Sequence, residues 1–402
     1  MALKPYAPSD IRNIALLGHG FSGKTSLAEA MLFNTGATSR LGLAGTPSST
    51  LDFEPEEHKR GGSISTSFAW VEYQDKKINL VDTPGDGNFI FDAFTAMQGA
   101  DAAYLVVSAT DGVEVGTERV YNKARELGIP CVIVINKMDR ERADYQDCLL
   151  GIEESFGVKP VPLQVPLGAE DSFEGVISLM QMKALRFAKD GSGAITKGDI
   201  PADLADEVAV AWEQLVEAVA ESDEELLEIY LDTFELSEEQ VKQGFHDALK
   251  KGAILPVLYT SATRNIGVNA LMGLATWAVP SPLEREPIDA ADADGNPILV
   301  EVGQGAPFYG QVVKTFMDEF SGKLSIFRVV SGQSPGDGQI WNSSHLSHER
   351  LGALYALRGT EREPVQQAVT GDILAVAKLK GTRTNDTLTL EGHGAVLPGQ
   401  TY

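Results

Sequence analysis

The stretch Gly18-His19-Gly20-Phe21-Ser22-Gly23-Lys24-Thr25 decides the fold that this sequence predicts. It fits the spacing G-x-x-x-x-G-K-[ST] of a phosphate-binding loop, whose glycines let backbone N–H groups converge on a phosphate at a helix N-terminus. The apolar run Ile14–Leu17 predicts a buried strand before the loop, and Lys24–Phe33 predicts a helix after it that ends near Gly36. A loop of this composition between a strand and a helix indicates a nucleoside triphosphate site.

Two side chains of this loop carry its chemistry. The Lys24 ammonium is expected to contact the β- and γ-phosphates, and the Thr25 hydroxyl is expected to bind Mg²⁺. The residues of this region expected to contact the nucleotide are Gly18, His19, Gly20, Phe21, Ser22, Gly23, Lys24, Thr25 and Ser26.

A second motif follows the predicted strand 78–82. It reads Asp82-Thr83-Pro84-Gly85. A carboxylate at Asp82 can hold Mg²⁺ through water, and the Gly85 amide can approach the γ-phosphate. This motif is expected to lie beside the phosphate-binding loop, because carboxyl ends of parallel strands meet at one edge of a sheet.

Two further motifs predict that the base is guanine. Asn136-Lys137-Met138-Asp139 ends the predicted strand 130–136, and Ser261-Ala262-Thr263 follows the predicted strand 254–260. The Asp139 carboxylate can accept both N–H donors that guanine presents, and amides of the second motif can support the same base. Adenine would leave that buried acceptor unpaired, at a cost of about 1–3 kcal/mol or more. Together the motifs predict binding of GTP and GDP.

Strand and helix signals alternate through the first 150 residues and resume near residue 254. Further strands are expected at 64–73 and 103–108, and helices at 91–99, 115–127 and 268–279. This alternation predicts an α/β fold in which helices cover both faces of a parallel sheet.

Changes of pattern divide the chain into parts. Residues 1–282 are expected to form the nucleotide-binding domain, with an α/β insertion at about 155–252. The Pro- and turn-rich stretch 283–306 predicts a linker. Short β-like runs punctuated by Gly and Asp over 307–402 predict a small antiparallel β-barrel.

Composition narrows the class of protein. The 402 residues carry a net charge of −24, with 57 acidic and 33 basic side chains, which makes the chain a poor general binder of polyanions. Two cysteines cannot build a disulfide framework, so a reducing cytosol is expected. No apolar run approaches about 18 residues, so no membrane partner is expected.

Acidic residues are concentrated at 201–250. This window holds 15 Asp and Glu against two Lys, a net charge of −13, and its apolar residues recur at helical spacing. Two interpretations remain open. The window is either a solvated helical face over an apolar stripe, or a docking surface for a basic partner.

The motifs and their flanks resemble the translational GTPases, and within them elongation factor G. The resemblance covers nearly the whole chain. Its supporting stretches are 161–170 with 182–184, Arg60-Gly61 followed by Ser63-Ile64, 308–316, 322–332, and Gly371-Asp372-Ile373 with Leu379.

The resemblance implies a G domain with an inserted subdomain, followed by the β-barrel domain II. It implies that Thr25, Ser63 and Asp82 bind Mg²⁺, and that two switch segments, about 38–62 and 86–97, order around the γ-phosphate. It also implies a cytoplasmic monomer that acts on the ribosome, touching rRNA and, through the acidic 201–250 helices, the basic stalk protein.

Three departures from the family pattern lie in the catalytic region. The histidine that follows Asp-Thr-Pro-Gly in the family is here Asp86, so this residue occupies the catalytic position beside Lys24. Phe21 replaces an aspartate of the loop, and Gly62 replaces an isoleucine of the first switch segment. A carboxylate near the γ-phosphate adds repulsion and cannot supply the charge of an imidazolium. We therefore expect hydrolysis to be slow, or to need the ribosome.

Alternative functions remain open at this point. One is a GTP-loaded module that binds the ribosome without meaningful turnover; another is a ribosome-protection or release-type GTPase; a third is a GTPase that acts away from the ribosome. The sequence stops at Tyr402, about where domain II of elongation factor G ends, and the family's three further domains do not follow. A two-domain fragment is expected rather than a naturally shortened protein.

Overall fold

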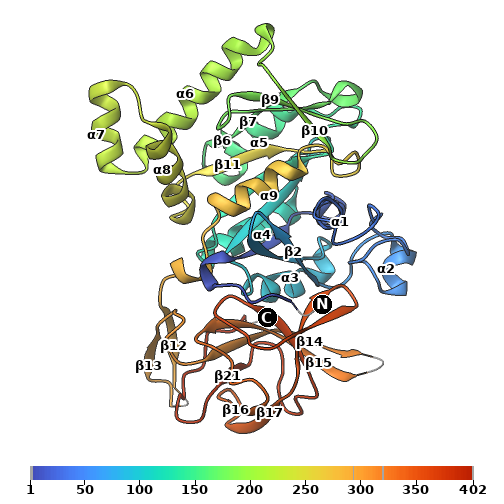
Figure 1. The fold of residues 1–402 in the computed structure, drawn as a ribbon, viewed down its shortest axis with the longest axis vertical. Helices are drawn as coiled ribbons and strands as arrows, with labels where there is room; N and C mark the ends of the chain where they lie inside the picture. The colour runs from blue at the N-terminus through green and yellow to red at the C-terminus, as the bar shows by residue number, and fades with distance from the viewer. Residues whose placement is uncertain (1–2, 293, 319–320, 401–402) are drawn as a thin grey trace.

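The computed structural model describes residues 3–292, 294–318 and 321–400. A central α/β layer carries an inserted subdomain at one end and an antiparallel β domain at the other (Figure 1). No helix in these ranges has the length and apolar character needed to span a bilayer.

The central sheet has seven strands in the order β2-β3-β1-β4-β5-β11-β6. Its strands are β1 (Ile11–Leu17), β2 (Ser67–Tyr73), β3 (Lys76–Asp82), β4 (Ala102–Ser108), β5 (Cys131–Asn136), β6 (Pro160–Pro162) and β11 (Leu255–Tyr259). All neighbours pair in parallel except β2, which is antiparallel to β3. The α/β fold predicted from the alternating pattern is confirmed, with one antiparallel edge strand that the pattern did not reveal.

Helices cover both faces of this sheet. On one face lie α1 (Lys24–Asn34) and α9 (Val268–Trp277), and on the other lie α3 (Ile90–Met97), α4 (Val115–Glu126) and α5 (Tyr145–Phe156). Alternate residues of β1 face the two cores, so Ile14 packs on the first and Ala15 on the second. The strand is therefore buried along its whole length.

The inserted subdomain combines a small sheet with three helices. Its antiparallel sheet, in the order β10-β9-β8-β7, contains β7 (Gln164–Leu167), β8 (Gly175–Ser178), β9 (Lys183–Phe187) and β10 (Ile195–Gly198). Its helices are α6 (Ala205–Glu221), α7 (Glu224–Thr233) and α8 (Glu238–Lys250). The expected range 155–252 also contains β6, but this strand pairs with β11 and so extends the central sheet.

The stretch expected to be a linker, 283–306, contains a β-hairpin. Its strands are β12 (Ile288–Ala291) and β13 (Pro297–Val300). Ala290 and Val300 pack against Tyr309 and Val330 of the following domain, so burial of these apolar side chains orders the hairpin.

The second domain is one antiparallel sheet of eight strands, in the order β17-β16-β21-β14-β15-β20-β18-β19. The strands are β14 (Tyr309–Asp318), β15 (Gly322–Ser331), β16 (Gly338–Asn342), β17 (Ser347–Leu351), β18 (Leu354–Arg358), β19 (Glu361–Val365), β20 (Ile373–Ala377) and β21 (Thr387–Thr389). The sheet encloses its own apolar core around Phe327 and Leu388.

Buried polar contacts join the two domains. Arg328 of β15 pairs with Asp101, and Lys77 of β3 pairs with Asp372 at 2.7 Å. The Asn13 amide donates to Asp101 and to the Gly371 carbonyl, each at 2.8 Å. Buried charges are tolerated only when paired, so these contacts specify one placement of the second domain.

One predicted strand begins later than expected. The pattern predicted a strand over 64–73, but β2 begins at Ser67. The Thr66 N–H donates to the Asp92 carboxylate, and the Thr66 carbonyl accepts from Lys314, so this backbone is satisfied outside the sheet.

Candidate nucleotide-binding site

Tight contacts require glycine at two positions of the phosphate-binding loop. Gly18 has φ 141°, and a Cβ there would lie 2.3 Å from the Val106 carbonyl oxygen. Gly23 has φ 102°, and a Cβ there would lie 2.2 Å from Asn136 Nδ2. Phe21 also adopts a left-handed conformation, with φ 61°, and its side chain is 70% exposed. The loop thus holds a strained aromatic residue at its outer rim.

Lys24 begins α1 and folds back over the loop. Its buried ammonium donates to the carbonyls of Gly18 at 3.1 Å and His19 at 2.7 Å. Burial lowers the pKa of Lys24 to about 8, with nearby carboxylates acting in the opposite direction. A Cβ at Gly85 would lie 2.3 Å from Lys24 Nζ, so the second motif passes directly over this ammonium.

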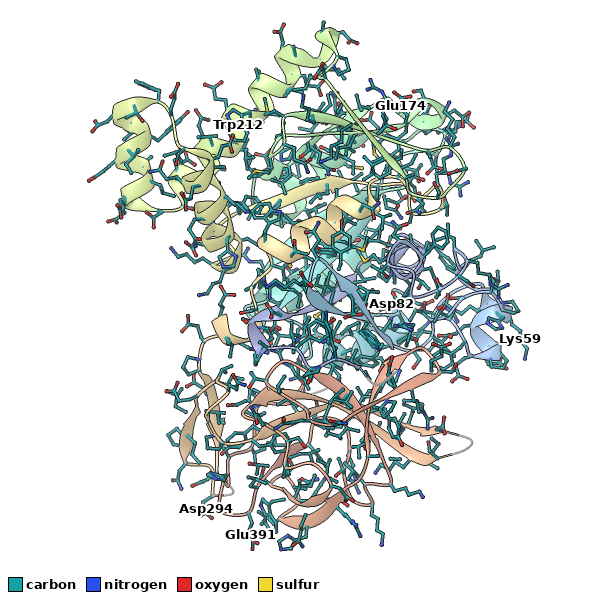
Figure 2. All side chains as sticks on the ribbon, viewed as in Figure 1. Lys59, Asp82, Glu174, Trp212, Asp294 and Glu391 are labelled. Carbon is teal, nitrogen blue, oxygen red and sulfur yellow. The ribbon has the colours of Figure 1, made fainter. Side chains whose placement is uncertain are left out.

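Oxygen ligands gather beside the loop. Thr25 Oγ1 lies 2.9 Å from Ser63 Oγ, and the Ser63 hydroxyl donates to Asp52 Oδ1 at 2.6 Å. Asp82, labelled in Figure 2 near the middle of the molecule, is buried at the end of β3. Its Oδ1 atom has no hydrogen-bond partner in the described parts of the chain.

This oxygen set fits a magnesium ion. Burial raises the pKa of Asp82 well above its usual range, and the nearby Asp52 carboxylate adds to that shift. A bound divalent cation would relieve both effects, and Mg²⁺ prefers carboxylate and hydroxyl oxygens. The motifs and the family resemblance predicted Thr25, Ser63 and Asp82 as metal ligands, which stays a prediction, and neither pointed to Asp52. Asp52 lies in the first switch segment with no motif around it.

Asn136 connects the phosphate-binding loop to the base-binding motifs. Its Nδ2 donates to the Ser22 carbonyl at 3.0 Å, and its Oδ1 accepts from Thr260 Oγ1 at 3.1 Å and from the Ala262 N–H at 3.0 Å. Three hydrogen bonds thus join the Asn136 amide to groups of the protein. Asn136 therefore positions the two loops, and its expected contact with the nucleotide stays a prediction.

Asp139 presents a free acceptor. The carboxylate is buried; its Oδ2 lies 3.2 Å from Arg264 Nε, whereas Oδ1 has no hydrogen-bond partner among the described residues. Arg264 pairs also with Asp171 at 2.9 Å and holds the carboxylate in place. A buried unpaired acceptor is costly and points to a donor supplied by a ligand. Sequence reasoning missed Arg264, which lies just past Thr263.

Other predicted residues have structural roles. Thr83 donates to the Leu16 carbonyl at 2.7 Å, and Met138 is a core residue whose N–H donates to the Thr260 carbonyl at 3.2 Å. Of the remaining predicted residues, Pro84, Ser261 and Ala262 are buried, Lys137 and Ser26 are half-buried, and Thr263 is exposed. His19 turns away from the loop toward Glu114, with 3.3 Å between Nε2 and the carboxylate.

A cavity of about 230 Å³ lies at the phosphate end of the site. Its lining comes from the loop, the second motif and both switch segments: Gly20, Phe21, Gly23, Lys24, Thr25, Ser26, Ala44, Asp52, Arg60, Gly61, Gly62, Ser63, Gly85 and Asp86. The base-binding motifs lie outside this cavity and are joined to it through Asn136.

Asp86 borders the cavity but is engaged by protein groups. Its Oδ1 accepts from the Asn88 N–H at 2.8 Å, and its Oδ2 pairs with Arg60 of α2 (Pro55–Arg60). The Asn88 hydrogen bond and the Arg60 guanidinium hold the pKa of Asp86 below its usual value, so the carboxylate is ionised at neutral pH. A weakly basic carboxylate of this kind is a poor general base.

Comparison with known proteins agrees with this geometry. Residues 9–281 match the family described as Elongation factor Tu GTP binding domain, and residues 307–391 match the family described as Elongation factor G domain 2. A crystal structure of a protein from Thermus thermophilus is similar, with a TM-score of 0.84 and 31% sequence identity. The match covers 98% of this chain and 55% of that one, so this chain spans about half of that relative.

The chain belongs to the translational GTPases that carry the elongation factor Tu GTP-binding domain. Within that class it is elongation-factor-G-like, because its second domain matches domain 2 of that factor.

Proposed function

We propose that this protein binds GTP and GDP together with Mg²⁺, and that it hydrolyses GTP slowly unless the ribosome stimulates it. The observation that carries this proposal is a pair of buried oxygens that have no hydrogen-bond partner among the described residues. These are Asp82 Oδ1, at the end of β3, and Asp139 Oδ1, shortly after β5 of the same sheet. One requires a cation and the other requires N–H donors. A guanine nucleotide with its metal ion supplies both.

Different side chains are proposed to bind the phosphates, the base and the metal ion. Lys24 and the loop amides attract the phosphates, while Asp139, oriented by Arg264, accepts from the base. Thr25, Ser63 and Asp82 would hold the magnesium ion, and Asp52 orients Ser63. When bound, this ion neutralises charge on the phosphate oxygens.

Slow hydrolysis follows from the groups that border the cavity. The Asp86 carboxylate is ionised and paired with Arg60, so it neither takes a proton readily nor donates one to the phosphates. Gly62 gives the first switch segment little apolar bulk, and the nearest neighbour of an added Cβ there would be the exposed Phe21 ring, at 3.3 Å. Little apolar surface therefore shields the attacking water.

Calorimetry with GTP, GDP and ATP in the presence of Mg²⁺ tests this proposal. We expect GTP and GDP to bind with dissociation constants of roughly micromolar size, and ATP to bind at least about a hundredfold more weakly. Equal affinity for GTP and ATP would contradict it. Omission of Mg²⁺ is the matched control, and it should weaken GTP binding.

We further propose the arrangement that the family resemblance implies. Residues 1–282 form the G domain with its insertion at about 155–252, residues 283–306 connect the domains, and residues 307–402 form domain II. The protein acts in the cytosol as a monomer on the ribosome, with domain II near rRNA. A module that binds the ribosome without turnover is the second candidate, favoured by the engagement of Asp86 with Arg60.

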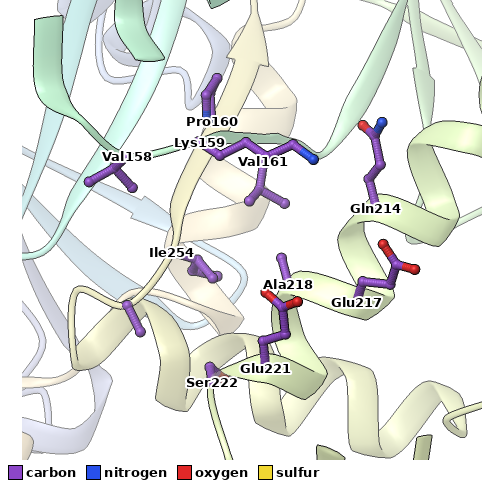
Figure 3. A pocket seen from close by; sticks show the side chains of 11 residues that line it. Val158, Lys159, Pro160, Val161, Gln214, Glu217, Ala218, Glu221, Ser222 and Ile254 are labelled. Atoms are coloured by element: carbon purple, nitrogen blue, oxygen red, sulfur yellow. The ribbon is translucent and has the colours of Figure 1, made fainter. Parts of the chain in front are cut away.

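The acidic insertion is proposed to meet the basic stalk protein of the ribosome. Glu217 and Glu221 of α6 line a cavity of about 310 Å³ with Gln214, Ser222 and Lys159 (Figure 3). Both carboxylates point from α6 into the cavity, on the side of Lys159 and Val161, where a cationic side chain could enter between them and the start of β6.

The next helix, α7, offers exposed apolar side chains. None of its residues, all of which the structure describes, is buried, and the exposed fraction is 62% for Leu231 and 75% for the capping residue Phe234. Exposed apolar side chains rimmed by carboxylates favour a basic, partly apolar partner.

Salt titration of binding to purified stalk protein tests this contact. E217Q/E221Q should weaken binding about tenfold at low salt and lessen its salt dependence, because two charges are lost from the interface. E238Q/E239Q removes the same charge from the start of α8, away from the cavity, and serves as the control. Equal effects of the two double variants would contradict a specific site.

A further inference from the structure

We propose that Lys314, in the second domain, is a positioning residue. It holds the chain just past the first switch segment to the helix of the second, and so sets how strongly the site distinguishes GTP from GDP. This inference rests on the guanine-nucleotide binding proposed above. It assigns to the second domain a direct part in shaping the phosphate end of the site.

One ammonium group joins three parts of the chain. Lys314 lies on β14, and its Nζ donates to Ser65 Oγ and, at 2.6 Å, to the Thr66 carbonyl. The same Nζ lies 3.5 Å from Asp92 Oδ2 on α3. The Thr66 N–H donates to that carboxylate oxygen, so Lys314, Thr66 and Asp92 form a closed triangle.

The triangle is largely shielded from water. The Lys314 side chain is only 11% exposed. Burial lowers the pKa of Lys314, and the carboxylates of Asp92, Glu57 and Glu54 act in the opposite direction. Leaving this buried ammonium without its partners would strongly destabilise the folded protein. Lys314 therefore holds Ser65, Thr66 and Asp92 together.

The three partners adjoin the segments that line the phosphate cavity. Ser65 and Thr66 follow shortly after Ser63, which lines the cavity and contacts Thr25. Asp92 lies in the second switch segment, on the helix that follows Asp86. Figure 1 shows β14 of the second domain beneath α3, where this contact occurs.

A second contact places the same domain against the first switch segment. Gly359, in the turn between β18 and β19, has φ 57°, and a Cβ there would lie 2.0 Å from the Thr50 carbonyl oxygen. From the other side, the Glu29 carboxylate accepts from the N–H groups of Thr50 at 2.6 Å and Leu51 at 3.0 Å. The first switch segment is thus confined between α1 and the second domain.

Holding the two domains together does not by itself explain the contacts of Lys314. The buried ion pairs Arg328–Asp101 and Lys77–Asp372 already join the domains, and none of these four residues lies in a switch segment. Lys314 differs because two separate segments meet at its ammonium. Movement of either segment toward a γ-phosphate must therefore change the contacts of a side chain in the second domain.

The test compares K314M with K380M in the full chain. K314M keeps an unbranched apolar side chain in place of the stem and removes the charge, whereas Lys380 is exposed and serves as the matched control. Affinities for GTP and GDP are measured with Mg²⁺, together with hydrogen exchange of 61–66 and 90–97. We expect K314M to weaken GTP about tenfold, to leave GDP within about twofold, and to speed exchange in both segments.

Each outcome decides the proposal. Equal losses for GTP and GDP, or unchanged affinities, would overturn it and leave Lys314 as an adhesive contact. If K314M does not fold, D92N replaces it, because it weakens the triangle while keeping the ammonium, and the same GTP-selective loss is expected. If the wild type binds no guanine nucleotide, the proposed function fails; unchanged exchange of the two segments in nucleotide-free K314M would then overturn the positioning role independently.

Discussion

Asp86 and Arg60 form an ion pair that joins the two switch segments across the mouth of the phosphate cavity. The carboxylate also caps the short 3-10 helix Gly87–Phe89 by accepting from the Asn88 N–H. Both interactions turn Asp86 toward the protein. The position that the family fills with a histidine is thus used here to connect two loops.

Replacing Asp86 with histidine should raise ribosome-stimulated hydrolysis. An imidazole restores a group that can donate to the phosphates and removes repulsion from the carboxylate, so we expect a gain of at least about tenfold in single-turnover rate. N88A, which removes no group from the catalytic position, is the control. No gain would place the limitation at Phe21 or Gly62 instead.

Replacing Asp139 with asparagine should weaken guanine nucleotides selectively. An amide offers one acceptor oxygen and adds a donor facing the guanine N–H groups, so GTP affinity should fall by about a hundredfold. Affinity for ATP should change little. D171N, which removes only the outer partner of Arg264, should have a much smaller effect, and calorimetry separates the two.

The buried pair between Asp101 and Arg328 should be essential for domain placement. R328M leaves the Asp101 carboxylate buried without its cation, and we expect a loss of about 3–5 kcal/mol in the free energy of unfolding. R350M breaks the exposed pair with Asp337 and should cost no more than about 1 kcal/mol. Urea denaturation of both variants measures the difference, and similar losses would refute the argument.

His246 of α8 and Glu284 should make stability depend on pH. Their side chains lie 2.6 Å apart. The hydrogen bond to Glu284 raises the pKa of His246; burial alone would raise the pKa of Glu284, but hydrogen bonds from His246 and Ser281 lower it to about 2. The stabilisation is therefore full below the unfolded-state pKa of the imidazole, near 6.5, and is lost as pH rises through the raised folded-state value.

The variant H246Q should remove this dependence. Thermal unfolding of the wild type should show a falling melting temperature between about pH 6 and pH 8, and H246Q should show a flatter profile there. On the acidic side, the contribution of Glu284 should be full above its unfolded-state pKa, near 4.5, and be lost as pH falls through the lowered folded-state value near 2. Identical slopes for the two proteins over about pH 6–8 would contradict the assignment.

Motif reasoning predicted the positions of residues well where one short segment sets the backbone geometry. Gly18 and Gly23 must be glycine because of close approaches, and Lys24 and Asp82 follow strands at the expected edge of the sheet. It also assigned Asn136 and Met138 to the nucleotide. The structure shows Asn136 joining two loops and Met138 in the core, and their nucleotide contacts stay predictions. Spacing alone cannot tell which way a side chain points.

The sequence by itself determined the α/β class, the phosphate-binding loop and the guanine motif, because these depend on hydrophobic periodicity and on residues that are neighbours along the chain. Only the tertiary structure revealed Asp52 beside the proposed metal ligands, Arg264 on Asp139, and Lys314 between the chain after the first switch segment and α3. In each case the partners lie far apart in sequence or in different motifs. Such contacts are set by the packing of whole elements, which local pattern does not encode.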